Sequence, residues 1–276
     1  MTDYRIPIAE TVRGTIDFLS DNFAPLTKAV SSVMETLIEF LVEGLLQVHP
    51  LIIIVVVALI AWRVASRGVA LFTFFGLLLI WNQNLWEPTV ETLALVVFAT
   101  AIAVLIGLPL GILSAIYKGV YRVVFPILDF MQTMPAFVYL IPAIPFFGLG
   151  PVSAIFSTVI FAMPPAIRLT CLGIKQVPES LTEAADAFGA TKSQKLLKVQ
   201  LPLAGPTIMA GVNQTIMLSL SMVVIAAMIG AGGLGSEVWK AIQRFQPGQG
   251  FAAGLGVVIL AIILDRITQQ VGAKNY

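Results

Sequence analysis

Few residues in this sequence have the types and spacing that catalysis requires. Asp129 and Asp265 are carboxylates near the ends of long apolar segments, where a carboxylate can act as an acid or a base. No nucleophile, metal motif or second carboxylate accompanies either one, and Asp129 is close enough to Arg122 to favour an ion pair over catalysis. His49 stands apart from any cluster of metal ligands, and Cys171 has no second cysteine for a disulfide. We interpret both as structural residues, Cys171 as a small buried one.

A glycine motif at residues 230–235 has the G-x-G-x-x-G spacing of a dinucleotide-binding turn. It follows an apolar helical segment and lacks the strand, turn and helix context that such a site needs. We therefore interpret it as a flexible turn outside the membrane. The G-x-x-x-x-G-K-[ST] phosphate loop is also absent from the sequence, so this chain is not expected to hydrolyse ATP itself.

A polar island at residues 168–202 interrupts the hydrophobic sequence. Ser180 and Glu183 have the spacing of a capping box, which predicts the start of a short helix, and Gly189 can end that helix in a left-handed conformation. Residues 191–194 repeat the start signal, and the second helix is expected to stop before Pro202. Two short helices meeting at a sharp corner could seat in a groove of a partner, although a solvated loop would show the same caps.

The composition identifies the chain as an integral membrane protein. Of 276 residues, 58% are hydrophobic and 11% are charged, and the mean hydropathy is +0.94. A span needs about 20 helical residues to cross about 30 Å of hydrocarbon. Seven segments approach that length, and the first is the weakest, so six spans is the alternative. The predicted spans are 46–62, 69–86, 92–117, 123–148, 151–167, 204–229 and 250–267.

Basic residues predict the orientation in the membrane. Eleven of the sixteen fall on one side in the seven-span interpretation, which places that side in the cytoplasm, with the N-terminus outside and the C-terminus inside. They are Arg63, Arg67, Lys118, Arg122, Arg168, Lys175, Lys192, Lys195, Lys198, Arg266 and Lys274. The net charge of +1 gives no reason to expect nucleic acid as a partner.

The chain divides into four parts by composition. Residues 1–45 form an amphipathic tail with at least one helix, whose acidic residues differ from the basic face of a typical interfacial helix. Residues 46–86 contain two accessory spans, residues 87–270 the helical core, and residues 271–276 a short tail. In the core, prolines within 123–148 predict a broken helix that lines a path through the membrane. The backbone groups freed by the break would be satisfied by surrounding protein or by a water-filled cavity.

Roughly residues 87–270 contain a set of distinctive segments, in addition to the acidic, alanine and glycine order of the polar island: Met131–Pro142, Phe147–Gly150, Pro164–Thr170, Gln200–Leu203, Pro206–Thr215, Met222–Ala226, Met228–Ala231 and Asp265–Thr268. Together they resemble the permeases of ATP-binding-cassette (ABC) importers for glycine betaine, proline betaine and choline. It implies an all-α, polytopic type I ABC importer domain in a prokaryotic inner membrane. It also implies three protein partners: a second permease copy, cytoplasmic ATPase subunits that hold ATP and Mg, and an extracytoplasmic substrate-binding protein.

The resemblance implies two groups of functional residues. The coupling helix that docks on the ATPase would contain Glu183, Ala184, Ala185, Asp186 and Gly189. The translocation pathway would contain Met131, Gln132, Met134, Asn213, Gln214, Met217 and Met222, although methionine stripes and amides also serve helix packing. We expect the chain to bind no cofactor. A permease for another small amino-acid-like solute, an intramembrane enzyme and an osmotic channel are the alternatives.

Overall fold

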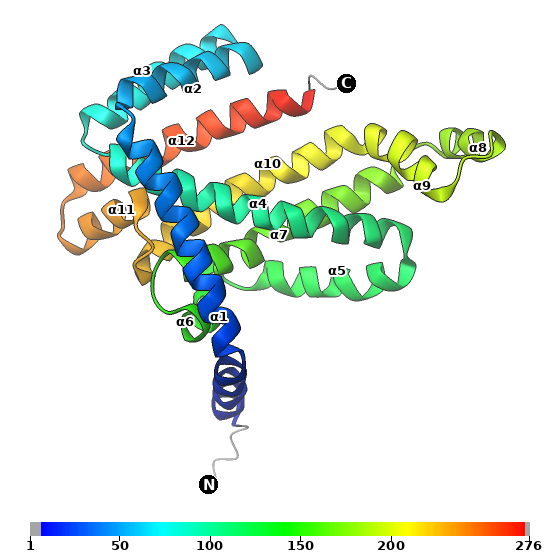
Figure 1. Ribbon diagram of the computed structural model, residues 1–276, viewed down its shortest axis with the longest axis horizontal. Helices are drawn as coiled ribbons and strands as arrows, with labels where there is room; N and C mark the ends of the chain where they lie inside the picture. The colour runs from blue at the N-terminus through cyan, green and yellow to red at the C-terminus, as the bar shows by residue number, and fades with distance from the viewer. Residues whose placement is uncertain (1–6, 274–276) are drawn as a thin grey trace.

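The computed structural model describes residues 7–273, and their regular elements are all helical (Figure 1). Four helical runs in this part are long and apolar enough to cross a membrane, and two bent helix pairs raise the number to six. This range includes the six-span alternative and does not reach seven. The four runs are α4 (Trp86–Ile116), α7 (Pro151–Lys175), a continuous run Lys192–Ile229 that includes α10 (Leu201–Ala226), and α12 (Pro247–Ala273).

The first two predicted spans form a hairpin of shorter helices. They correspond to α2 (Pro50–Val64) and α3 (Arg67–Asn82), of 15 and 16 residues, which pack against each other. Each is shorter than an undistorted membrane-spanning helix, which needs about 20 residues. His49 caps α2, because its Nδ1 accepts a hydrogen bond from the Leu51 amide at 3.3 Å. The predicted structural role of this histidine is confirmed.

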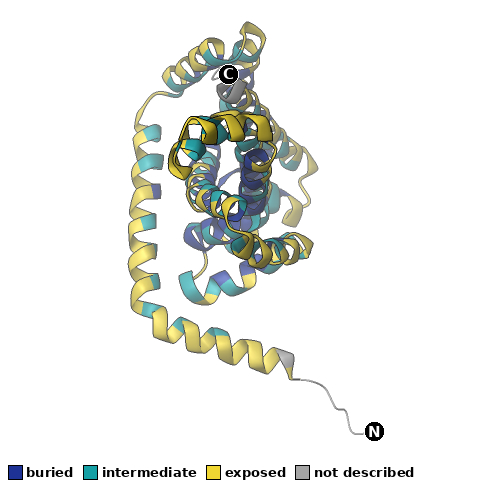
Figure 2. Ribbon diagram, turned by 90° about the vertical axis from the view of Figure 1, so that its right-hand side faces the viewer, coloured by how far each residue is buried: buried dark blue, intermediate teal, exposed yellow. Residues whose placement is uncertain are grey.

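The N-terminal tail contains a single 40-residue helix, α1 (Ile8–Gln47), which confirms the expectation of a helix there. It runs across the direction of the helix bundle and bends by 102° into α2 (Figure 1). Most of its surface is exposed, as Figure 2 shows. Ile38 is its one buried apolar side chain among those described, and the Ser20 hydroxyl donates to the Pro145 carbonyl at 2.8 Å. The helix is therefore attached along one narrow face.

Helix α7 lies between α4 and α10 and forms the centre of the core. Glycines allow α4 to approach it closely: a Cβ on Gly111 would lie 2.6 Å from the Thr170 Cβ and 2.8 Å from the Ile167 carbonyl oxygen. Cys171 on α7 is 1% exposed, as expected for a small buried residue. Gly107 and Gly111 therefore form a close contact that joins α4 to α7.

We expect Gly111→Val to destabilise the purified protein, because the added side chain meets backbone and a buried threonine that cannot move away. Overpacking of this kind typically costs about 1–3 kcal/mol. The measurement is the thermal melting of the detergent-solubilised protein. Gly119→Val is the matched control, since a Cβ at Gly119 meets nothing within 4 Å. Equal melting temperatures for the two variants would contradict the proposed close contact.

The predicted break in the fourth span is confirmed. Helix α5 (Lys118–Thr133) and the pair η1 (Ala136–Tyr139) and α6 (Leu140–Phe147) meet at an angle of 113°. Met134 is extended, with ψ of 136°, because the following Pro135 disfavours helical geometry. The Tyr139 hydroxyl donates to the Met131 carbonyl across the break. A side chain thus satisfies a backbone group that the break leaves free.

The glycine motif at 230–235 is a packed joint, so the prediction of a flexible turn is wrong. It connects η3 (Ala227–Ile229) to α11 (Gly233–Gln243). The Glu91 carboxylate accepts a hydrogen bond from the Gly233 amide at 2.6 Å, and the Thr92 hydroxyl accepts one from the Leu234 amide at 2.8 Å. Side chains of α4 therefore cap the N-terminus of α11. Local spacing gave no sign of this, because α4 and α11 are far apart in sequence.

Candidate functional site

The predicted docking corner projects from one end of the bundle (Figure 1). It consists of α8 (Glu179–Ala187) and the single-turn α9 (Lys192–Lys195) and joins α7 to the run that becomes α10. None of the α8 residues is buried. The structure places the candidate coupling residues on α8 and at its C-terminal end. These residues are Glu183, Ala184, Ala185, Asp186 and Gly189.

The start of α8 differs from the prediction. Pro178 precedes the helix in an extended conformation, with ψ of 133°, and no side chain caps it. Because the helix already begins at Glu179, Ser180 lies inside the first turn, where its hydroxyl cannot act as the cap. The Thr182 hydroxyl instead donates to the Glu179 carbonyl at 2.9 Å. The S-x-x-E spacing located the helix correctly and its first residue incorrectly.

The end of α8 and the start of α9 agree with the prediction. Gly189 has φ of +74°, and its amide donates to the Asp186 carbonyl at 2.9 Å. Thr191 and Gln194 form the reciprocal capping box: the Thr191 hydroxyl accepts from the Gln194 amide, and the Gln194 side chain accepts from the Thr191 amide at 2.9 Å. A left-handed glycine followed by a capped helix gives the sharp corner that the spacing predicted.

An ion pair holds the two helices of the corner together. The Lys195 ammonium lies 2.7 Å from the Asp186 carboxylate, and 23% of the lysine side chain is exposed. Phe188, between these elements, is 92% exposed. Sequence analysis did not select Phe188, although an aromatic residue next to a predicted corner glycine is a usable signal. The corner is therefore a fixed, exposed surface with an apolar tip.

The second helix of the corner does not stop before Pro202 as predicted. A π-helical turn, η2 (Leu196–Gln200), leads directly into α10, and Pro202 lies in the first turn of that helix. The π turn accommodates the proline: the Leu201 amide donates to the Leu196 carbonyl in the i→i+5 pattern, and Pro202 itself has no amide hydrogen to donate. The corner is consequently joined to α10 by continuous helix. A displacement of the corner can be transmitted along α10 without an intervening hinge loop.

The candidate pathway residues occupy different environments on α5 and α10. Met131, Met134 and Asn213 are partly buried, whereas Gln132, Gln214 and Met217 are exposed. Met222 is fully buried and belongs to the central apolar cluster. The seven residues do not converge on one described cavity. Their role in a pathway stays a prediction.

Asn213 belongs to a polar cluster that links α10 to α12. Its amide donates to the Asp265 carboxylate at 2.7 Å, and its carbonyl oxygen accepts from the Thr268 hydroxyl at 2.6 Å. The Gln269 amide also donates to Asp265 at 2.7 Å. Asp265 therefore joins two helices.

Asp129 forms the ion pair that the sequence predicted, with a different partner. Its carboxylate lies 2.5 Å from the Arg168 guanidinium on α7, whereas the expected partner was Arg122. Both candidate catalytic carboxylates are thus engaged in contacts between helices. Within residues 7–273, no group of three or more His, Cys, Asp or Glu side chains is placed to hold a metal ion.

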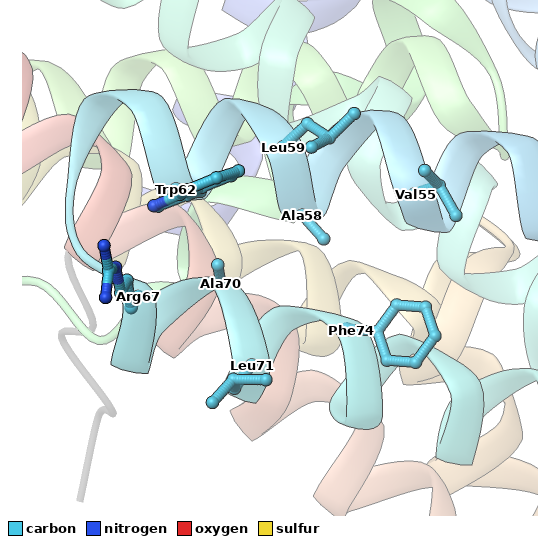
Figure 3. Close-up of a pocket in the computed structure, with 8 residues that line it drawn as sticks. All are labelled: Val55, Ala58, Leu59, Trp62, Arg67, Ala70, Leu71 and Phe74. Atoms are coloured by element: carbon cyan, nitrogen blue, oxygen red, sulfur yellow. The ribbon is translucent and has the colours of Figure 1, made fainter.

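An apolar groove of ≈ 430 Å³ runs along the α2–α3 hairpin. Its lining is aliphatic and aromatic, with Arg67 and Trp62 at the end where the chain turns between the two helices (Figure 3). Leu59 and Leu71 are 52% and 60% exposed. Such a surface suits contact with lipid, where an aromatic ring and a cation at one end favour the membrane interface.

Known proteins place this architecture in a family. Residues 107–274 match the binding-protein-dependent transport system inner membrane component family. The glycine betaine transport system permease protein OpuAB of Bacillus subtilis is 49% identical over 98% of this chain and 96% of its own length. The glycine betaine/proline betaine transport system permease protein ProW of Escherichia coli is 48% identical over 98% of this chain and 76% of its length.

Solved structures support the same assignment. The MetNI methionine ABC transporter, in an inward-facing conformation, matches with a TM-score of 0.63 and 25% identity, over 67% of this chain and 93% of that chain. A second crystal form of MetNI matches with a TM-score of 0.59 and 27% identity, over 69% of this chain and 93% of that chain. The chain therefore has a type I ABC importer fold and belongs to the family of binding-protein-dependent transport system inner membrane components.

Proposed function

We propose that this permease imports a quaternary-ammonium compatible solute, such as glycine betaine, proline betaine or choline, at the expense of ATP hydrolysed by a partner subunit. The observation that carries the mechanism is the exposed corner, held by the Asp186–Lys195 ion pair and continuous with α10. The choice of solute rests on the relatives, whose names refer to glycine betaine, proline betaine, carnitine and choline transport.

The corner of α8 and α9 docks in a cleft of the ATPase in this proposal. Phe188 and the small residues Ala184 and Ala185 supply an apolar, closely fitting surface, while Glu183 and Asp186 lie on its polar side. When ATP and Mg draw two ATPase subunits together, the corner moves with them. Helices α7 and α10 transmit that movement to the bundle, which opens alternately to either side of the membrane.

The orientation follows from the same proposal. The end of the bundle that carries α8 and α9 faces the cytoplasm, and α12 runs toward that side (Figure 1), so the C-terminus is inside. The distribution of basic residues favours an N-terminus outside. The predicted cytoplasmic Lys274 lies outside the described residues. A second permease copy completes the pathway. A binding protein on the outer side holds the solute in an aromatic cage by cation–π attraction and delivers it.

The pathway in this proposal lies between α5 and α10 and their counterparts in the second copy. Gln132, Gln214 and Met217 are the accessible members of the proposed set, and Met131, Met134 and Asn213 are partly covered. Met222 has no exposed surface, so its participation requires α10 to move away from the central cluster during transport. A small set of soft and amide side chains would bind solute weakly, as passage through a membrane requires.

Uptake by proteoliposomes tests the function. We expect the permease, reconstituted with its ATPase and binding protein, to accumulate labelled glycine betaine only when ATP is enclosed on the ATPase side. Unlabelled proline betaine and choline are expected to compete, and ordinary amino acids are not. An ATPase variant that binds ATP without hydrolysing it is the control. Uptake without ATP would indicate a channel, and uptake of only an amino acid such as methionine would favour the alternative solute class.

A further inference from the structure

A cavity of ≈ 750 Å³ between α5 and α7 has no role in the transport mechanism described above. Helix α5 begins and α7 ends at the end of the bundle that carries α8 and α9 (Figure 1). The cavity thus lies at the level where the helices leave the proposed cytoplasmic face of the membrane. Its lining residues are Lys118, Tyr121, Arg122, Phe125, Pro126, Asp129, Arg168 and Lys175.

The cavity has an excess of positive charge. Four of its side chains are cationic and one, Asp129, is a carboxylate already paired with Arg168. Within the described part of the chain, Lys118 and Arg122 have no ion pair or hydrogen bond from their side chains. Like charges gathered at one site repel each other, and an anion within about 4–6 Å would offset this repulsion. The lining therefore complements an anion.

Two aromatic rings hold the other two cations in position. Tyr121 and Phe125 stack with their centroids 3.9 Å apart. The Lys175 ammonium lies 3.6 Å from the Tyr121 centroid, and the Arg168 guanidinium carbon lies 5.5 Å from that of Phe125. The Arg168 Nε is buried and has no hydrogen-bond partner among the described residues. The cation–π contact leaves the Lys175 charge without a counter-ion, whereas Arg168 is also paired with Asp129.

The lining also has an apolar part. Tyr121, Phe125 and Pro126 line the cavity next to the cations. A ligand that fits this lining is amphiphilic, with an anionic group for the cations and hydrocarbon for the apolar part. Basic pockets between membrane helices on the cytoplasmic side have the chemistry that binds anionic lipid headgroups.

We propose that the cavity between α5 and α7 binds the phosphate headgroup of an anionic phospholipid from the leaflet on the α8–α9 side. Lys118 and Arg122 contact the phosphate, and Arg168 and Lys175 contribute from α7. Asp129 keeps Arg168 oriented and does not contact the lipid. The acyl chains leave the cavity beside Phe125 and Pro126. This lipid is a resident ligand of the permease and is distinct from the transported solute.

Native mass spectrometry of the detergent-purified full-length permease, in its native assembly, tests the proposal without requiring transport. Phosphatidylglycerol is compared with phosphatidylcholine of the same acyl chains. We expect the first phosphatidylglycerol to bind with a Kd lower by roughly tenfold or more, since each basic residue near the headgroup adds to the attraction. The double variant Lys118→Gln, Arg122→Gln is expected to lose that preference. Both side chains are exposed, so the variant is expected to fold, and its circular dichroism spectrum and melting temperature verify this.

Arg67→Gln is the matched control. Arg67 is an interfacial cation outside the cavity, at the end of the apolar groove in Figure 3, so its loss tests whether any interfacial charge has the same effect. We expect the control to retain the preference for phosphatidylglycerol. Unchanged lipid preference in the double variant would overturn the proposal, as would equal loss in the control.

Two further outcomes identify a different occupant. If millimolar inorganic phosphate displaces phosphatidylglycerol completely, the cavity takes a free anion and the lipid assignment is wrong. If a cysteine introduced at Arg122 forms a near-quantitative crosslink between two permease copies while lipid preference is unchanged, the cavity is an interface between copies. A photoactivatable phosphatidylglycerol that labels residues 118–130 and is competed by unlabelled phosphatidylglycerol is the expected result.

Discussion

Gly189→Val is expected to abolish most solute-stimulated ATP hydrolysis and uptake while leaving the amount of permease in the membrane unchanged. Gly189 adopts φ of +74°, and a Cβ there would meet no atom within 4 Å, so the penalty comes from the backbone and not from crowding. A left-handed conformation costs an L-residue about 1–2 kcal/mol, which corresponds to roughly a 5- to 30-fold change in the population of the corner. A β-branched residue is the least tolerant of this geometry.

Two further variants make the Gly189 prediction specific. Gly189→Asn is expected to retain most of the activity, because asparagine adopts the left-handed region more readily than valine does. Gly119→Val adds the same side chain to a glycine with ordinary helical φ and open surroundings, and should transport normally. ATP hydrolysis and uptake by reconstituted complexes are the measurements. Normal coupling in Gly189→Val would show that the left-handed corner is not needed for docking.

Gly233→Val is expected to be the most destabilising single substitution at the joint between α4 and α11. Gly233 has φ of +73°, and an added Cβ would lie 2.4 Å from the Thr92 hydroxyl oxygen. That oxygen accepts from the Leu234 amide, so the new side chain displaces a hydrogen bond at the start of α11 as well as straining the backbone. Each lost hydrogen bond to a buried group costs about 1–3 kcal/mol, in addition to the conformational penalty.

The measurement for Gly233→Val is the thermal melting of purified permease, together with its yield from the membrane. Gly248→Val is the control, since a Cβ at Gly248 meets nothing within 4 Å and its φ is not positive. Glu91→Gln separates charge from packing, because it keeps an acceptor for the Gly233 amide but removes the negative charge at the N-terminus of α11. We expect it to lower the melting temperature less than Gly233→Val. An unchanged melting temperature in Gly233→Val would contradict the close packing of Gly233 between α4 and α11.

Local sequence patterns predicted the class of the protein and the shape of its exposed corner. Apolar runs determine that the core helices are buried in a membrane. The free energy of moving a helical segment into hydrocarbon depends on the composition of that segment and not on the helices it later packs against. The break at Pro135, the left-handed Gly189 and the capping box at 191–194 were also predictable, because each depends on the backbone of a few consecutive residues. The misplaced start of α8 shows the limit of such rules. The helix begins at Glu179, directly after Pro178, and not after Ser180 as the capping pattern indicated.

Contacts between distant segments could not be predicted in the same way. Asp129 pairs with Arg168, 39 residues away, although Arg122 is much nearer in sequence. The amide of Gly233 is bound by Glu91 across 142 residues, which turned an expected flexible turn into a fixed joint. Helical geometry sets which side chains share a face, but the packing of α4 against α7 and α11 sets which faces meet. The sequence by itself thus determined membrane burial and most local helix ends. Only the tertiary structure decided the partners of its few charged residues, because those partners depend on the packing of whole helices.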